Sequence, residues 1–208
     1  MIQKDRVSPG YYKRIKGVFS ELFPKYGNLS PKLFHPGFLT NIQSEQLAKS
    51  LTPTTVNRKL EIIRAILNFS ERQRRIPYSP TRGYRKLKEI REDIKHWERH
   101  EAEDFLRFAS KKYFIGRPKR WIYAVYLLAI NAGPRAGEIW GLQPRDIVQD
   151  GELILIQRQF DNVIRDFRTT KGKTSRRIPC NPVLKEELLR IIETDGLRSD
   201  QTIFRRAD

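Results

Sequence analysis

An arginine and a glutamate three residues apart, Arg135 and Glu138, are the side chains of this sequence best suited to chemistry. A guanidinium can bind two oxygens of a phosphate at once, which makes Arg135 a candidate anion-binding group. Glu138 can accept hydrogen bonds from free backbone N–H groups at the start of a helix, where the helix dipole favours negative charge. It could equally hold the guanidinium in place. The pair therefore predicts either an anion-binding site or a local ion pair.

The elements around this pair are predicted to hold it at a site. The run 124–130 is apolar and uncharged, which predicts a helix buried on nearly all sides. Residues 131–133 end that helix, and Pro134 suits the first position of a new one. Arg135 then falls in the first turn of a short second helix. Because the chain returns to the core at residues 139–142, Arg135 is expected to face a site rather than bulk solvent.

The pattern changes to β-strands after Pro144. Three short strands are predicted, at residues 152–157, 163–169 and 175–179, with turn signals at 161–162 and 171–173. Lys171 is therefore expected at the tip of a hairpin. A basic residue there can reach into a site built by other elements.

Two segments resemble catalytic motifs of the tyrosine recombinases, or phage integrases. Gly133 to Leu142 matches the first box of that family, Gly-x-Arg-x-Gly-Glu, an apolar residue, and then Gly-Leu. Lys171 to Pro179 is similar to its Lys-Gly-x-Lys-x-x-Arg-x-Pro segment. Thr55 to Arg58, followed by an apolar stripe and Pro80, looks like the end of the core-binding domain of an integrase. The resemblance covers the core-binding domain and roughly the first half of the catalytic domain.

This resemblance implies a reaction in DNA integration and recombination. In the family, a tyrosine attacks the scissile phosphate, arginines stabilise the charge and a lysine protonates the leaving 5′-hydroxyl, without metal or cofactor. It implies that Arg135 contacts the phosphate, that Glu138 supports it, and that Lys171 is the acid, with Lys173 as the alternative. The other boxes of the family lie further along the chain than these segments.

The nucleophile is not found where the resemblance places it. The sequence has no tyrosine after Tyr126 and no histidine after His100. Tyr113, Tyr123 and Tyr126 lie in or beside the predicted buried helix and are expected to pack in the core. The sequence therefore predicts a chain truncated before the nucleophile, and it leaves open whether this chain is an enzyme.

The charge of the chain indicates a polyanionic partner. Lys and Arg number 41 against 24 Asp and Glu, which gives a net charge of +17. The basic residues are spread over the whole chain, so double-stranded DNA is favoured over a membrane surface. Besides the catalytic candidates, the predicted DNA contacts are Arg58, Lys59, Arg64, Arg72, Arg74, Arg75, Arg117, Lys119, Lys173, Arg176 and Arg177.

The single cysteine permits no intrachain disulfide and supports no cysteine-rich metal site. No apolar segment approaches about 20 residues, and the N-terminus lacks the apolar stretch of a signal peptide. These features predict a soluble cytoplasmic protein. The resemblance adds a bacterial, phage or mobile-element context.

The expected fold class is α+β, mainly helical with a small antiparallel sheet. Residues 1–92 are predicted to form a helical core-binding domain, and residues 93–208 the N-terminal part of an integrase catalytic domain. Helices are predicted over residues 8–26, 38–50, from Thr52 into a basic tail at 72–75, from Glu101, and over 182–192. The charged stretch 86–95 has the composition of a solvated linker.

Three hypotheses follow for the function. The leading one is an integrase-type DNA-binding chain that does not complete strand cleavage alone. The second is a non-catalytic regulator that occupies recombination sites, and competes or assembles with a complete recombinase or with itself. The third is a general basic nucleic-acid-binding protein whose motif similarity is accidental, which predicts no preference between DNA sequences.

Overall fold

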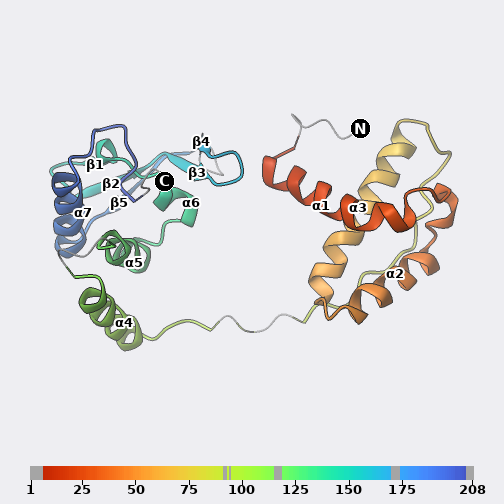
Figure 1. Ribbon diagram of the computed structural model, residues 1–208, viewed down its shortest axis with the longest axis horizontal. Coiled ribbons are helices and arrows are strands. Elements are labelled where there is room, and N and C mark those ends of the chain that lie inside the picture. Colours follow the sequence, from red (N-terminus) through yellow and green to blue (C-terminus); the bar gives the residue numbers. More distant parts are fainter. Residues whose placement is uncertain (1–6, 91–92, 94, 115–118, 170–173, 205–208) are drawn as a thin grey trace. The chain divides into compact units, whose positions relative to one another are not determined.

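The computed structural model describes residues 7–90, 93, 95–114, 119–169 and 174–204 (Figure 1). It divides into two compact units, residues 1–94 and 95–208. The first unit is helical. The second combines helices with short antiparallel strands, so the structure has the α+β composition that the sequence predicts.

Among its described residues, the first unit has three α-helices, labelled α1, α2 and α3 in Figure 1, and one short 3-10 turn. Ser8 Oγ caps α1 by accepting from the Tyr11 N–H at 3.3 Å, and Thr52 Oγ1 caps α3 by accepting from the Thr55 N–H at 3.3 Å. A proline follows each cap, where its missing N–H costs nothing. Both predicted helix starts are confirmed. The bounds are α1 Pro9–Tyr26, the turn η2 Pro31–Leu33, α2 Pro36–Ala48 and α3 Pro53–Arg72.

The core of the first unit lies between α1, α2 and α3. Its most deeply buried side chains are Leu39, Ile42, Val56 and Leu60. The spacing of apolar residues in α1 predicts that Phe19 and Phe23 share the buried face with Ile15, Val18 and Leu22, but they remain 45% and 49% exposed. The buried stripe instead runs through Ile15, Val18, Leu22 and Tyr26. The two phenylalanines lie one position further round the helix, where they stack on each other with ring centroids 5.0 Å apart.

The start of the stretch 86–95 is not a solvated linker, contrary to the prediction, and the residues just before it are also fixed to the first unit. Tyr84 is buried, and Gln43 of α2 donates to its hydroxyl. Asn57 of α3 holds the backbone of Leu87 at both ends, since its Nδ2 donates to the Leu87 carbonyl and its Oδ1 accepts from the Leu87 N–H, both at 2.9 Å. The same Nδ2 donates to Glu89 at 2.8 Å. The charges of this segment face outward while its backbone is fixed to the first unit.

We expect Asn57→Ala to lower the unfolding free energy of the first unit by about 2 kcal/mol, because it leaves the Leu87 N–H and carbonyl without their partner. All three tryptophans of the chain, Trp97, Trp121 and Trp140, lie in the second unit. Urea unfolding followed by circular dichroism should therefore show an earlier transition, while the tryptophan fluorescence transition stays in place. Arg58→Ala, a change at the exposed neighbouring position, should shift neither by more than about 0.5 kcal/mol. An unchanged dichroism midpoint for Asn57→Ala would contradict the role given to the two hydrogen bonds between Asn57 and the Leu87 backbone.

The second unit has four α-helices, a short 3-10 turn and five strands among its described residues. The strands form two small antiparallel sheets, one of three strands in the order β1-β2-β5 and one of two strands, β3-β4. The bounds are α4 Arg99–Lys112, α5 Trp121–Ala132, α6 Ala136–Trp140, η3 Pro144–Asp146, β1 Ile147–Val148, β2 Leu153–Ile156, β3 Arg158–Asp161, β4 Asp166–Thr169, β5 Arg176–Pro179 and α7 Pro182–Thr194.

The strand pairing corrects the predicted hairpin around Lys171. The two strands that flank it do not pair with each other: β5 pairs with β2, with Ile154 opposite Ile178, and β4 pairs with β3, with Phe160 opposite Phe167. The sequence analysis did not predict the strands β1 and β3. The chain from Leu153 to Asp161 passes from one sheet to the other at Gln157, so its two halves have different neighbours. Lys171 falls in the connection between β4 and β5, outside the described residues.

The core of the second unit gathers α5 and α7 against the three-stranded sheet. Ala124, Leu128, Ile154, Leu184 and Leu188 are fully buried. The helix α5 is less enclosed than predicted, since Ile130 is 38% exposed.

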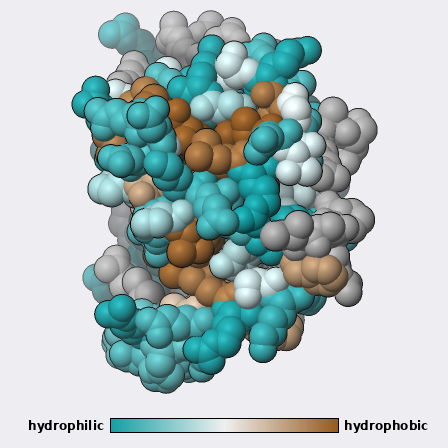
Figure 2. Space-filling model, turned by 90° about the vertical axis from the view of Figure 1, so that its left-hand side faces the viewer, coloured by the Kyte–Doolittle hydropathy of each residue, from teal (hydrophilic) through white to brown (hydrophobic). Residues whose placement is uncertain are grey.

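Figure 2 shows apolar surface among hydrophilic regions on the side where α4 and α7 lie. Within the described part of the chain, no helix has the length and apolar character needed to cross a membrane.

Candidate phosphate-binding site

The corner between α5 and α6 places Arg135. Gly133 ends α5 in the left-handed conformation, with φ of 59°, and its N–H donates to the Ala129 carbonyl at 3.1 Å. A side chain would strain this backbone conformation, which explains the first glycine of the motif. Arg135 then has an extended backbone as the N-cap residue of α6, and not a place in its first turn as predicted. Pro134 lies before the helix for the same reason. The side chain of Arg135 leaves the corner 61% exposed.

Glu138 is the anchor of the corner. Its side chain is completely buried, and its Oε2 accepts from the Arg135 N–H at 2.8 Å. Its Oε1 accepts from the Arg135 guanidinium at 3.1 Å. Both roles that the sequence offers for this glutamate, the helix cap and the support of the guanidinium, are therefore filled by one carboxylate.

A second arginine completes the site from β5. Arg176 donates to Glu138 through two parallel bonds, Nη1 to Oε1 at 2.9 Å and Nη2 to Oε2 at 2.7 Å. This fork-to-fork geometry is the strongest arrangement available to an arginine and a carboxylate. Hydrogen bonds from Arg176 and Arg135 outweigh the cost of burial and lower the pKa of Glu138 to about 2. In turn, Glu138 raises the pKa of Arg176.

The two later glycines of the motif allow α6 to approach β3 closely. A Cβ on Gly141 would lie 3.0 Å from the Phe160 backbone N, and one on Gly137 would lie 3.1 Å from the Phe160 carbonyl oxygen. Backbone atoms cannot give way as a flexible side chain can, so any side chain at either position would push the helix off the strand. The three glycines thus fix the turn and the seat of the short helix that carries Arg135 and Glu138.

The arrangement can bind an anion. One carboxylate holds two guanidinium groups, so the three side chains keep one net positive charge. Glu138 is buried on the inside, while Arg135 and Arg176 are 61% and 40% exposed on the outside. A guanidinium held by a rigid carboxylate needs little reorganisation to meet a phosphate, which is the feature expected of a preorganised electrostatic site.

Other buried ion pairs hold the surroundings of this site. Asp146 accepts from the Gln143 N–H at 2.9 Å and from Gln157 Nε2 at 2.8 Å, and it also pairs with Arg158 of β3. Glu187 of α7 pairs with Arg120, beside the start of α5. The sequence analysis did not identify these two ion pairs, because their partners are 12 and 67 residues apart in the sequence. Each of these ion pairs joins two elements of the second unit, and its two charges neutralise each other.

The predicted DNA contacts lie in several different settings. The Lys59 ammonium is engaged within the first unit. It donates to both carboxylate oxygens of Glu21, at 2.8 and 2.6 Å, and to Gln46 at 2.9 Å. Arg64 lies over the Tyr84 ring, 5.4 Å from its centroid. The exposed members of the set are Arg58, Arg72, Arg74, Arg75, Lys119 and Arg177, and Arg117, Lys171 and Lys173 lie outside the described residues.

The tyrosines of the second unit pack as the sequence predicts. Tyr123 is buried beneath Arg120, whose guanidinium lies 4.9 Å from its ring centroid. Tyr126 packs edge-on against Phe105 at 4.9 Å, and Tyr113 lies 6.4 Å from Tyr126. Burial raises the pKa of Tyr123, which opposes formation of a nucleophilic phenolate.

Among the described residues, no group of three or more His, Cys, Asp and Glu side chains is placed to hold a metal ion.

Comparison with solved structures identifies the fold. A complex of the Tn1549 transposon integrase with circular intermediate DNA has a TM-score of 0.65 and 15% sequence identity, over 86% of this chain and 65% of that one. The same integrase with transposon right end DNA also has a TM-score of 0.65 and 15% identity, over 92% of this chain and 71% of that one. The XerH site-specific recombinase, bound to its palindromic difH substrate in a post-cleavage complex, has a TM-score of 0.54 and 20% identity, over 91% of this chain and 53% of that one.

The chain therefore has the fold of the tyrosine recombinases, as its motifs predict. It spans about two thirds of the length of the Tn1549 integrase chain and about half of the XerH chain. No protein-family model matches the sequence, and no curated protein matches it at a significant level.

We expect Glu138→Gln to lower the unfolding free energy of the second unit by about 3 kcal/mol at pH 7, since it leaves two guanidinium groups without their buried counter-charge. The pKa of Glu138 is near 2 in the folded chain against an ordinary value of 4.5. Its charge therefore stabilises the fold fully above about pH 4.5, and this contribution is lost as the pH falls toward 2. The difference between wild type and Glu138→Gln should shrink over the same range.

Urea unfolding followed by tryptophan fluorescence at a series of pH values measures this difference. Glu186→Gln is the matched control, because Glu186 is exposed and pairs only with Arg190 on the surface of α7 among the described residues. It should change stability by less than about 1 kcal/mol at every pH. A Glu138→Gln effect that is constant between pH 7 and pH 3 would contradict the role given to the charge.

Proposed function

We propose that this chain binds duplex DNA as the core-binding unit and part of the catalytic unit of a tyrosine recombinase, with Arg135 as a ligand of the scissile phosphate. The observation that carries the proposal is the exposed Arg135 guanidinium held on buried Glu138 beside Arg176. The fold and the net charge of +17 support it. The complexes of the Tn1549 integrase and XerH contain DNA, which agrees with the same use of the fold here.

In this proposal Glu138 and Arg176 act as positioning residues. Glu138 fixes the guanidinium of Arg135 by two bonds, one to its backbone and one to its side chain. Arg176 begins β5 and donates to the same carboxylate. Lys171 or Lys173, which lie outside the described residues, is the proposed acid because their segment is similar to the lysine motif of the family.

The proposed reaction needs a tyrosine that the described second unit does not offer at this site. Tyr113, Tyr123 and Tyr126 are engaged in its aromatic core. In this proposal the nucleophile is therefore none of these three tyrosines. This same observation favours a second candidate function, a non-catalytic protein that occupies recombination sites and competes or assembles with a complete recombinase.

DNA binding is expected to depend on the exposed arginines of α3 and the turn that follows it. Each phosphate contact that is removed should reduce the slope of log affinity against log salt by about 0.9. The triple variant with Arg58→Gln, Arg72→Gln and Arg74→Gln should lower that slope by about 2 to 3, measured by fluorescence anisotropy on a labelled duplex. A control with three other exposed cations, Lys32→Gln, Lys111→Gln and Arg198→Gln, should leave it nearly unchanged. Equal loss in both triples would indicate charge attraction without a defined face.

Strand cleavage is tested on a substrate that the protein itself selects. Duplexes bound from a random pool should converge on a consensus, whereas a general basic protein would enrich none. A nicked duplex with that consensus then traps any covalent protein–DNA product. We expect no covalent band from residues 1–208 alone, and binding that Arg135→Ala weakens only slightly. A covalent band that is lost in Tyr113→Phe, Tyr123→Phe or Tyr126→Phe would show that a core tyrosine is the nucleophile and would overturn the assignment.

A further inference from the structure

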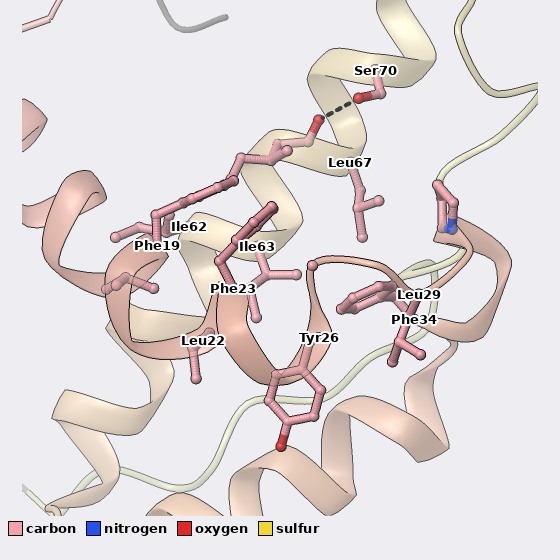
Figure 3. A pocket seen from close by; sticks show the side chains of 14 residues that line it. Phe19, Leu22, Phe23, Tyr26, Leu29, Phe34, Ile62, Ile63, Leu67 and Ser70 are labelled. Carbon is pink, nitrogen blue, oxygen red and sulfur yellow. Dashed lines mark hydrogen bonds between the residues drawn. The ribbon is translucent and has the colours of Figure 1, made fainter.

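The first unit carries an open apolar groove between α1 and α3, separate from the arginine site of the second unit. Its apolar part is a hollow of about 220 Å³ lined by side chains from both helices and from the turn after α1. Figure 3 shows Phe19 and Phe23 of α1 among Ile62, Ile63 and Leu67 of α3, with Leu29 and Phe34 at one end. A second hollow adjoins it and shares Phe19, Ile66 and Ser70 with it, so the two form one continuous groove.

The apolar part of the groove offers no free polar group among its described lining residues. The hydroxyl of Ser70 donates to the Ile66 carbonyl at 3.0 Å, the bond drawn in Figure 3. The hydroxyl of Tyr26 points away from the hollow and donates to Glu45. Phe19 and Phe23 are nearly half exposed although they are large and apolar. An occupant that covers them would therefore gain free energy mainly from burying apolar surface.

The other end of the groove is basic. Lys16 and Arg75 line the second hollow, and no aspartate or glutamate lies among the described residues that line either part. Neither cation has an ion-pair partner in the part of the chain that the structure describes, although Lys16 lies 6.0 Å from the Tyr12 ring centroid. The groove thus presents an apolar floor that ends in two positive charges.

We propose that this groove binds an amphipathic helix of an acidic partner protein. The α1 side of the groove runs from Tyr12 to Tyr26, which at 1.5 Å per residue is about 20 Å and matches a helix of about four turns. Apolar side chains at three- and four-residue spacing would fill the apolar part, and carboxylates at one end would meet Lys16 and Arg75. The phosphates of a nucleic acid would gain no binding energy from the apolar side chains of the groove. A second copy of this chain is disfavoured because two chains of charge +17 repel each other.

The probe for this groove is a fluorescein-labelled model peptide of about 15 residues that carries leucine along one helical face and glutamate beside it. Its binding to the full chain is followed by anisotropy at physiological salt. We expect Phe19→Ser with Phe23→Ser to weaken binding at least about tenfold, because these side chains form one wall of the groove. Circular dichroism of this variant should show an intact helical unit, since both side chains are nearly half exposed in the wild type and lie outside the buried stripe of α1.

Charge is tested on Lys16 alone, because Arg75 is also a candidate DNA contact. Lys16→Glu should weaken peptide binding about fivefold, whereas Lys13→Glu, the same change on the same helix outside the groove lining, should change it less than about twofold. A peptide of the same composition in shuffled order, which forms no apolar face, should bind at least about tenfold more weakly. Equal binding of the shuffled peptide would overturn the proposal, as the attraction would then be charge alone. A concentration-dependent dimer in sedimentation that Phe23→Ser abolishes would also overturn it, in favour of a second copy.

Discussion

The carboxylate of Glu138 is the interaction on which the candidate site depends. It is fully buried, and its burial would be unfavourable without partners, yet it accepts bonds from one backbone N–H and two guanidinium groups. Each partner comes from a different constraint: the N–H from the helix start, the Arg135 guanidinium from the spacing within the motif, and Arg176 from the strand β5. Because the helix α6 is only five residues long, this anchor and the close seat on β3 are what hold it in place.

The same principle, a buried polar group that organises the chain around it, operates in the first unit. Asn57 uses its amide as a substitute for a strand neighbour, and so gives the segment around Leu87 the two backbone bonds that it would otherwise lack. Tyr84, from the same segment, adds its ring to the core and receives a bond from Gln43. The first unit therefore extends beyond its last helix, and the basic residues of that stretch are displayed on a fixed backbone.

The two units display their charges and apolar surface in different ways. In the second unit, positive charge is concentrated at a corner where a buried carboxylate directs two arginines outward. In the first unit, cations are exposed at the end of α3, and an apolar groove lies between α1 and α3. A phosphodiester backbone binds best to exposed cations, because it is charged and solvated. An amphipathic helix instead needs an apolar groove for its apolar face. One chain can thus provide a surface for each kind of partner, with Arg75 shared between the two.

The amino-acid sequence by itself determined what depends on a few neighbouring residues. The helix starts at Ser8 and Thr52, the glycine turn before Arg135 and the pairing of Arg135 with Glu138 all follow from contacts within about one turn of chain. Only the tertiary structure decided the exposure of Phe19, the partners of the strands β4 and β5, and the bond from Arg176 to Glu138 across 38 residues. The physical reason is that local propensity has short range. The choice among distant partners is instead made by shape and burial, which no spacing within the sequence encodes.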